Sequence, residues 1–431
     1  MDDFPLRGGV VHCEDVPLPR IALEVGTPVY VYSTASMLRQ ARVLKSALAG
    51  LGGASGDPLI AFAVKANPNP AVLATLAAEG LGADVVSGGE YLRARAAGIA
   101  ADRIVFSGVG KTAAEMALAL DGGLCQFNLE SVPEAEMLSR IAAARGVEAA
   151  VALRVNPDVD AGSHAKISTG SAHNKFGVAI GDAVAACARI EALPGLGLVG
   201  VAVHIGSQLT RLAPLEAAFE RLGGLIRALR AEGHDIRTAD LGGGLGLAYD
   251  PAAPPPPTTA DYGAMVARVT SGWGTRLIFE PGRLLVGGAG VLLTTVIRVK
   301  PGPAVPFVVV DAAMNDLMRP SLYDAWHSAD AVAPNGETMV ADIVGPVCET
   351  GDTFARARPI DRVEAGELMI IRTAGAYAAT MGSTYNSRPL APEVLVNGAE
   401  WAVVRERPPP EEMLRGYKAP HWLRAADGEG R

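Results

Sequence analysis

Residues 59–67 read LIAFAVKAN, an apolar run that closes on a lysine, Lys65. Continuous apolar runs of this length are typical of strands that are buried on both faces, as in a parallel sheet. Similar runs follow along the chain, with alanine- and leucine-rich stretches of helical spacing between them. The eight runs are LIAFAVK (59–65), ADVVS (83–87), RIVFSG (103–108), LCQFNL (124–129), AAVALRVN (149–156), LVGVAVHIG (198–206), RTADLGGG (237–244) and RLIFEPG (276–282).

This alternation predicts the α/β class, because successive βα units build a parallel sheet that helices cover. Eight strands with seven intervening helices in roughly 225 residues fit a (β/α)8 barrel of the TIM type. An open, doubly wound sheet stays an alternative, since periodicity does not distinguish the two. The PAAPPPP tract (251–257) suits neither a helix nor a central strand, so we expect a surface loop in the seventh unit. Helices are expected at 70–80, 89–98, 112–123, 132–146 and 215–233.

The pattern changes after residue 285. Strand-like segments, separated by glycine and proline turns and without regular helices, follow at 290–300, 307–311 and 368–374. They predict a mostly antiparallel β domain, and GTPVYVYS (26–33) reads as a further strand of it. We therefore expect a barrel at 36–284, inserted into a β domain that is built from 1–35 and 285–431.

Composition limits the classes of protein that this chain can be. Hydrophobic residues make up 49% of its 431 residues, which excludes global disorder. The net charge of −8, without a long basic run, argues against nucleic acid as a partner. Four scattered cysteines without a CxxC pair predict neither a disulfide framework nor a zinc site, and we expect no metal. Without a visible signal peptide or an apolar run of roughly 18 residues, we expect a cytoplasmic protein that does not bind membranes.

Reactive side chains follow several strands at their carboxyl ends, where a barrel carries its active site. Lys65 ends the first strand, and an amine in an apolar pocket can lose its proton and react with a carbonyl group. The glycines of LGGGLG (241–246) follow the seventh strand, where barrels often bind phosphate. The sixth and eighth strands are followed by His204, Ser207, Glu280 and Arg283.

Each of these groups alone has an ordinary interpretation as a solvated lysine, a hydrogen-bonded core histidine or a glycine turn. Together they supply an amine, an imidazole, a phosphate-binding turn and a carboxylate that can face a protonated ring nitrogen. That set is typical of a pyridoxal 5′-phosphate (PLP) site. The glycine run is not a G-x-G-x-x-G that opens a dinucleotide-binding unit, so a nicotinamide cofactor is not indicated.

Ten stretches in a fixed order extend this comparison over nearly the whole chain. They are AFAVKAN (61–67), ADVVSGGE (83–90), FSGVGKT (106–112), NKFG (174–177), HIGSQ (204–208), GGGLG (242–246), EPGR (280–283), MNDLMRPSLYDAWH (314–327), GPVCETGD (345–352) and GAYAATMGSTYNSRP (375–389). With them the chain resembles the diaminopimelate decarboxylases, which belong to the alanine-racemase-like fold group of PLP-dependent enzymes.

The resemblance implies roles around the cofactor. Lys65 would hold PLP covalently, Glu280 would keep the ring nitrogen protonated, and His204 would stack on the ring face. Asp84 and Arg154 would lie near the cofactor and orient the other groups. The remaining cofactor-binding positions that the resemblance implies are Ser207, Gly242, Gly243, Gly244, Gly282, Arg283 and Tyr377.

The resemblance also implies a reaction, the decarboxylation of meso-2,6-diaminopimelate to L-lysine and CO2, which is the last step of lysine biosynthesis. That substrate carries an amino-acid group at each end, so the enzyme must choose one. Arg283, Arg319 and Tyr323 suit the carboxylate that is kept, because a guanidinium forms paired hydrogen bonds with a carboxylate. Glu349 suits the ammonium group at the same end, and Tyr377 would also contact the substrate.

The family forms head-to-tail homodimers with shared active sites, so Cys348 and Glu349 are expected to reach the cofactor of the partner subunit. Cys348 is expected to protonate the product carbon, with Lys65 as the other possible donor. The ordinary interpretation of Cys348 is a small buried hydrophobic residue. For Arg319 and Glu349 it is a structural ion pair between the two domains.

Other functions stay open at this point. A related PLP decarboxylase could act on another basic amino acid or on a carboxylated polyamine, although Arg319 with Glu349 argues against a substrate that lacks a second carboxylate. A PLP-binding protein without turnover would have no need of Lys65, Glu280 and Cys348 together. A racemase is conceivable on the barrel alone, because a fold does not determine a reaction.

Overall fold

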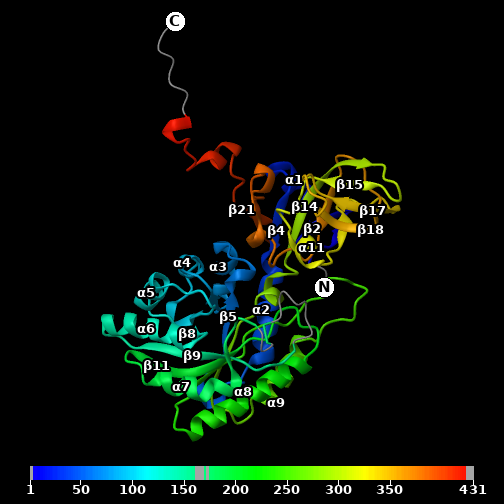
Figure 1. Ribbon diagram of the computed structural model, residues 1–431. Helices are drawn as coiled ribbons and strands as arrows, with labels where there is room; N and C mark the ends of the chain where they lie inside the picture. Colours follow the sequence, from blue (N-terminus) through cyan, green and yellow to red (C-terminus); the bar gives the residue numbers. More distant parts are fainter. Residues whose placement is uncertain (1–2, 161–168, 171–173, 424–431) are drawn as a thin grey trace.

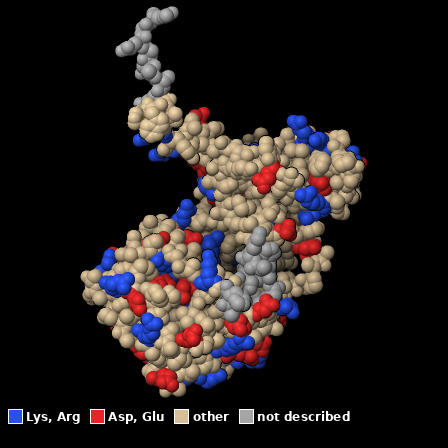
Figure 2. Space-filling view, viewed as in Figure 1, with Lys and Arg blue, Asp and Glu red and all other residues tan. Residues whose placement is uncertain are grey.

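The computed structural model describes residues 3–160, 169–170 and 174–423. These residues form two bodies, a barrel surrounded by helices and a β domain that lies beside its mouth (Figure 1). Acidic and basic side chains are interspersed over the face drawn in Figure 2. No helix among the described residues combines the length and the apolar character that crossing a membrane requires.

Eight parallel strands form the barrel, and each of them overlaps one of the eight predicted runs, although β6 and β11 begin one and two residues before theirs. Every strand pairs with the next in parallel register, and the last pairs with the first. This closure confirms the predicted barrel and rules out the open sheet. The strands are β5 (Leu59–Ala63), β6 (Gly82–Val85), β7 (Ile104–Phe106), β8 (Gln126–Leu129), β9 (Ala149–Asn156), β11 (Leu196–Val203), β12 (Thr238–Asp240) and β13 (Arg276–Phe279). A short strand, β10 (Val178–Ala179), pairs with β9 beside them.

Helices follow the strands and shield their outer faces. Their starts are set by local chemistry: the side chains of Ser87 and Ser131 accept hydrogen bonds from the first turns of α4 and α6, and Thr112 forms a capping box with Glu115 in α5. The helix before β5, α2 (Thr34–Leu48), packs against α3 and α9 and completes the ring. The others are α3 (Pro70–Ala78), α4 (Gly88–Ala96), α5 (Ala113–Asp121), α6 (Val132–Arg145), α7 (Ala183–Glu191), α8 (Ala213–Ala231) and α9 (Thr259–Val269).

The second sheet is organised around one long strand, β14 (Gly290–Lys300). It pairs antiparallel with β4 (Val29–Ser33), β15 (Phe307–Val310) and β19 (Leu368–Ile371). Among the described strands of this second sheet, only the β15–β17 and β4–β20 pairings are parallel, so the prediction of a mostly antiparallel sheet is confirmed. The remaining strands are β16 (Ala329–Ala331), β17 (Thr338–Val344), β18 (Thr353–Asp361), β20 (Glu393–Asn397) and β21 (Glu400–Arg405).

Several short elements were not anticipated. The first residues form a small sheet of β1 (Leu6–Arg7), β2 (Val10–Cys13) and β3 (Val16–Pro17), followed by α1 (Leu18–Val25). Two short helices, α10 (Arg283–Val286) and α11 (Arg319–Tyr323), lie in the part that was predicted to lack regular helices or at its border. Both helices begin at an arginine that the sequence analysis singled out.

Candidate active site

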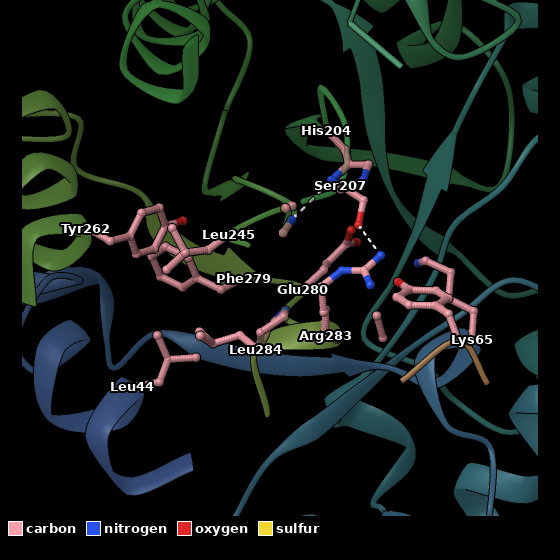
Figure 3. Close-up of a pocket in the computed structure, with 17 residues that line it drawn as sticks. Leu44, Lys65, His204, Ser207, Leu245, Tyr262, Phe279, Glu280, Arg283 and Leu284 are labelled. Atoms are coloured by element: carbon pink, nitrogen blue, oxygen red, sulfur yellow. Dashed lines mark hydrogen bonds between the residues drawn. The ribbon is translucent and has the colours of Figure 1, made fainter. Parts of the chain in front are cut away.

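The carboxyl ends of the barrel strands open into a pocket that gathers most of the predicted residues (Figure 3). A neighbouring hollow shares Lys65, His204 and Glu280 with it and adds Ser107 and Arg154. The lining of the main pocket consists of Leu44, Ala63, Lys65, His204, Ser207, Gly242, Gly243, Gly244, Leu245, Tyr262, Phe279, Glu280, Pro281, Gly282, Arg283, Leu284 and Tyr377.

Lys65 lies in a single turn of 3-10 helix (Val64–Ala66) directly after β5. Its ammonium group is 2.5 Å from Oδ2 of Asp84, which lies at the end of β6 and is fully buried. Burial opposes the charged form of Lys65 and is the largest single effect, but the interactions with Asp84, Tyr377 and Glu280 together outweigh it, so the pKa of Lys65 is raised. The amine is therefore held as a cation at the mouth of the barrel and needs a proton acceptor before it can react.

Glu280 follows β13 and belongs to a buried polar network inside the barrel. Its Oε1 accepts hydrogen bonds from Ser107 Oγ at 3.1 Å and from Asn128 Nδ2 at 3.3 Å. Burial raises the pKa of Glu280 well above its usual range, and the neighbouring carboxylates of Asp240 and Asp84 add to the effect. Burial also raises the pKa of Asp240 to about 6. A carboxyl group in this position ionises readily only when a cation lies opposite it.

The glycines after β12 are required by the closeness of neighbouring loops. A Cβ atom on Gly243 would lie 2.1 Å from the carbonyl oxygen of Glu280, and one on Gly244 would lie 2.5 Å from that of Gly206. Gly242 and Gly244 also adopt positive φ angles, +63° and +117°, which favour glycine. The backbone N–H groups of Gly242 and Gly243 donate to Asp240 and to His204, whereas that of Gly244 donates to no other described residue. Of the three glycines, Gly244 is thus the one whose N–H is available to a ligand.

His204 is a neutral imidazole with a fixed orientation. Burial holds the pKa of His204 well below its usual range, and the charges of Arg154 and Lys65 lower it further. Its Nδ1 accepts the hydrogen bond from Gly243 at 3.2 Å, which places the ring hydrogen on Nε2. Arg154, on β9, pairs with Glu130 at 2.7 Å and reaches the carbonyl oxygen of His204. Arg154 therefore helps to hold the backbone of His204 in place.

Arg283 and Arg319 come from different elements, α10 and α11, and converge on Tyr249. Each donates a hydrogen bond to the tyrosine hydroxyl, at 2.5 Å and 2.6 Å. Both side chains are buried, and no carboxylate among the described residues forms an ion pair with either. Tyr323 lies on the same short helix as Arg319, and Tyr377 places its ring 4.7 Å from the Arg283 guanidinium carbon. Sequence reasoning missed Tyr249, which lies two residues before the proline tract.

Cys348 and Glu349 lie elsewhere in the chain. They are exposed in the turn between β17 and β18 and line neither hollow around Lys65. The side chain of Glu349 is hydrogen-bonded to Tyr385, and within the described residues it forms no ion pair with Arg319. The interpretation of Arg319 and Glu349 as an ion pair within one chain is therefore wrong. A single chain leaves Cys348 and Glu349 outside the pocket.

Comparison with known proteins gives the family. Residues 35–287 match the model described as "Pyridoxal-dependent decarboxylase, pyridoxal binding domain". The chain is 56% identical to a diaminopimelate decarboxylase of Zymomonas mobilis, over 98% of this chain and 100% of the relative. The chain belongs to the diaminopimelate decarboxylases. A diaminopimelate decarboxylase of Neisseria meningitidis is 48% identical over 93% of this chain and 97% of the relative.

The fold agrees with that of solved diaminopimelate decarboxylases. The structure of the enzyme from M. jannaschii in complex with L-lysine superposes with a TM-score of 0.93 at 33% identity, over 97% of this chain and 98% of that chain. The resemblance that the sequence analysis stated is thereby confirmed.

The residues of this chain fit PLP, the cofactor of the family. Oδ1 of Asp84 is buried and has no hydrogen-bond partner among the described residues, so the carboxylate has capacity for a further donor. Glu280 is suited to a cationic ring nitrogen because of its raised pKa. Gly244 and Ser207 border the part of the pocket where a phosphate group would be held.

Proposed function

We propose that the chain decarboxylates meso-2,6-diaminopimelate to L-lysine and CO2, the last step of lysine biosynthesis. The observation that carries this proposal is the pair of buried guanidinium groups of Arg283 and Arg319, which lack a carboxylate partner among the described residues. Buried cations are costly unless an anion balances them, and a substrate with a second carboxylate supplies that anion. The complex of the M. jannaschii relative with L-lysine supports the proposal, because L-lysine is the expected product and keeps this carboxylate.

In this proposal PLP withdraws the electron pair that remains when CO2 leaves. Lys65 would hold the cofactor covalently, and Asp84 would accept and return the proton of its amine. Glu280 would pair with the ring nitrogen and keep it protonated. His204, Ser207, Gly282 and Tyr377 line the same pocket and would hold the ring and the phosphate group.

The arginine pair decides which end of the substrate reacts. Arg319, with Tyr323 on the same helix, would bind the carboxylate that is kept, which would direct the other end of the substrate toward the cofactor. Arg283 lies between Arg319 and the phosphate side of the pocket, because it contacts both Tyr249 and Ser207. It is placed to serve the substrate and the cofactor together.

We further propose that two copies form a head-to-tail homodimer with shared sites. Cys348 and Glu349 are exposed and lie outside the pocket of their own chain, as expected of residues that act in the partner's site. In the dimer Glu349 would bind the ammonium group at the retained end of the substrate. Cys348 would deliver the proton to the product carbon, with Lys65 as the other candidate donor.

Release of lysine and CO2 by the purified protein with PLP tests the reaction. Meso-diaminopimelate is compared with L-lysine, L-ornithine, L-arginine and carboxynorspermidine as substrates. We expect turnover of diaminopimelate alone, its loss in Lys65→Ala, and unchanged turnover in the exposed control Lys418→Ala. Turnover of another amine would overturn the role of Arg319. Failure to turn over any of them would leave a PLP-binding protein.

A further inference from the structure

Tyr249 occupies the centre of the arginine pair. It lies in the loop between β12 and α9, whereas Arg283 begins α10 beside the barrel and Arg319 begins α11 in the second body. Besides the two hydrogen bonds to its hydroxyl, the tyrosine ring lies 4.5 Å from the guanidinium carbon of Arg319 and 5.6 Å from that of Arg283. The phenol therefore links the two cations through both its oxygen and its ring.

The hydrogen bonds leave one donor available. A phenol oxygen accepts about two hydrogen bonds, and the two arginines supply both. The hydroxyl hydrogen of Tyr249 must then be donated to a third group, and no described residue is recorded as its acceptor. An anion between the arginines would receive donors from both guanidinium groups and from the phenol. The arrangement thus presents three donors to one carboxylate.

The surroundings hold Tyr249 in place. The ring of His327 meets the ring of Tyr249 edge-on, with centroids 5.1 Å apart and an interplanar angle of 74°. His327 is buried and donates from Nδ1 to the carbonyl oxygen of Arg372. After Tyr249 the chain turns at Asp250, whose side chain and carbonyl oxygen accept from the N–H groups of Ala252 and Ala253. The prolines at 254–257 then stiffen the loop.

We propose that Tyr249 is a positioning residue that determines specificity for the retained carboxylate, by fixing the two guanidinium groups around it. The proposal rests on the function proposed above. In this proposal the loop after β12 takes part in substrate recognition through Tyr249, in addition to contributing its glycines to the pocket. The affinity for ligands that carry the retained carboxylate should depend on Tyr249, whereas the affinity for ligands without that carboxylate should not.

Two ligands separate these cases in the holoenzyme. L-Lysine carries the retained carboxylate, and cadaverine has the same carbon chain and amines without it. Their dissociation constants are measured from the change in absorbance of the bound cofactor. For Tyr249→Phe, which keeps the ring and loses the hydroxyl, we expect L-lysine to bind about tenfold more weakly. The dissociation constant of cadaverine should change by less than about twofold. The KM for diaminopimelate should rise by a similar factor with little change in kcat.

A second variant distinguishes positioning from packing. Tyr249→Gln lacks the ring but offers an amide oxygen that can accept from both arginines. If the hydroxyl fixes the guanidinium groups, the glutamine variant recovers part of the L-lysine binding that the phenylalanine variant loses. The opposite order, in which Tyr249→Phe behaves as wild type and Tyr249→Gln does not, would overturn the proposal and leave Tyr249 as a packing residue. The exposed residue Tyr417, changed to phenylalanine, is the matched control.

Further outcomes of these measurements also test the role of Tyr249. Equal weakening of L-lysine and cadaverine, or weakening of neither, contradicts the role of Tyr249. If the wild-type enzyme does not turn over diaminopimelate, the proposed function fails, but the preference for L-lysine over cadaverine in wild type and in both variants still tests this inference. The two failures are therefore distinguishable.

Discussion

At His327, burial and the neighbouring positive charges both lower the pKa of the imidazole. Burial lowers the pKa of this imidazole to about 3, and the guanidinium groups of Arg319, Arg283 and Arg358 strengthen the effect. The folded protein therefore keeps His327 neutral at a pH where the unfolded chain, with an ordinary histidine pKa near 6.5, binds a proton. Protonation favours the unfolded state, so stability is lost as the pH falls below about 6.5.

His327→Gln removes this titration but keeps a donor for the carbonyl oxygen of Arg372. Between pH 7.5 and 5.5 we expect the free energy of unfolding of the wild type to fall by up to about 1.4 kcal/mol more than that of the variant. Thermal unfolding at the two pH values, with His421→Gln as the exposed control, measures the difference. A parallel pH dependence in wild type and His327→Gln would contradict the neutral, buried state of this histidine.

Individual residues also show which parts of the site the sequence pattern predicts and which parts it does not. Lys65 and Glu280 follow apolar strands directly, so the barrel pattern alone predicted that they would meet at its mouth. Asn128 and Asp240 lie within or at the end of strands, where polar residues gave no sign of the network that they form with Glu280. Tyr249 lies in an irregular loop. Its partners depend on tertiary contacts, which a periodic pattern in the sequence does not predict.

Among the elements, the loops after β12 and β13 depend on each other. The Cβ of an alanine at position 243 would lie 2.1 Å from the carbonyl oxygen of Glu280, so one loop must move. We expect Gly243→Ala to lower stability by about 1–3 kcal/mol and to weaken cofactor binding. Thermal unfolding and the amount of PLP retained after dialysis measure both effects.

Gly181→Ala is the matched control, because a Cβ there has nothing within 4 Å. It should leave both properties unchanged. Wild-type stability and full cofactor retention in Gly243→Ala would show that the loop has room that the structure does not reveal.

The elements also divide into those that a sequence predicts and those that it does not. Each of the eight barrel strands overlaps a predicted run, because strands buried on both faces need continuous apolar sequence. The strands β1 and β3 have two residues each, too short for any period, and α10 and α11 are only a turn or so long. The positions of such short elements follow from tertiary packing. The bounds 36–284 for the inserted domain remain a prediction.

For the whole molecule, the proposed shared sites lead to a test by mixing subunits. Each site would need Lys65 from one chain and Cys348 from the other, so Lys65→Ala and Cys348→Ala homodimers should both be inactive. Co-expression should restore about a quarter of the wild-type activity per subunit, because half of the dimers are mixed and each of these has one intact site.

The activity is measured first on the unfractionated mixture. Purification through a different tag on each subunit then isolates the mixed dimers, whose activity should be about half that of wild type because one of their two sites is intact. Absence of recovery would contradict the shared site, and full activity of Cys348→Ala alone would remove Cys348 from the reaction. Cys125→Ala, at a cysteine far from the pocket lining, is the matched control.

The position of β4 has a consequence for synthesis on the ribosome. This strand is buried along its whole length between β14 and β20, yet β14 begins about 260 residues later and β20 about 360 residues later in the chain. At about 5–20 residues per second, its second neighbour emerges roughly 20 to 70 seconds after it. Until β14 emerges, β4 has neither partner, although the barrel segment behind it is already being made. The nascent chain is therefore most exposed to aggregation at β4, where we expect chaperones to bind during translation.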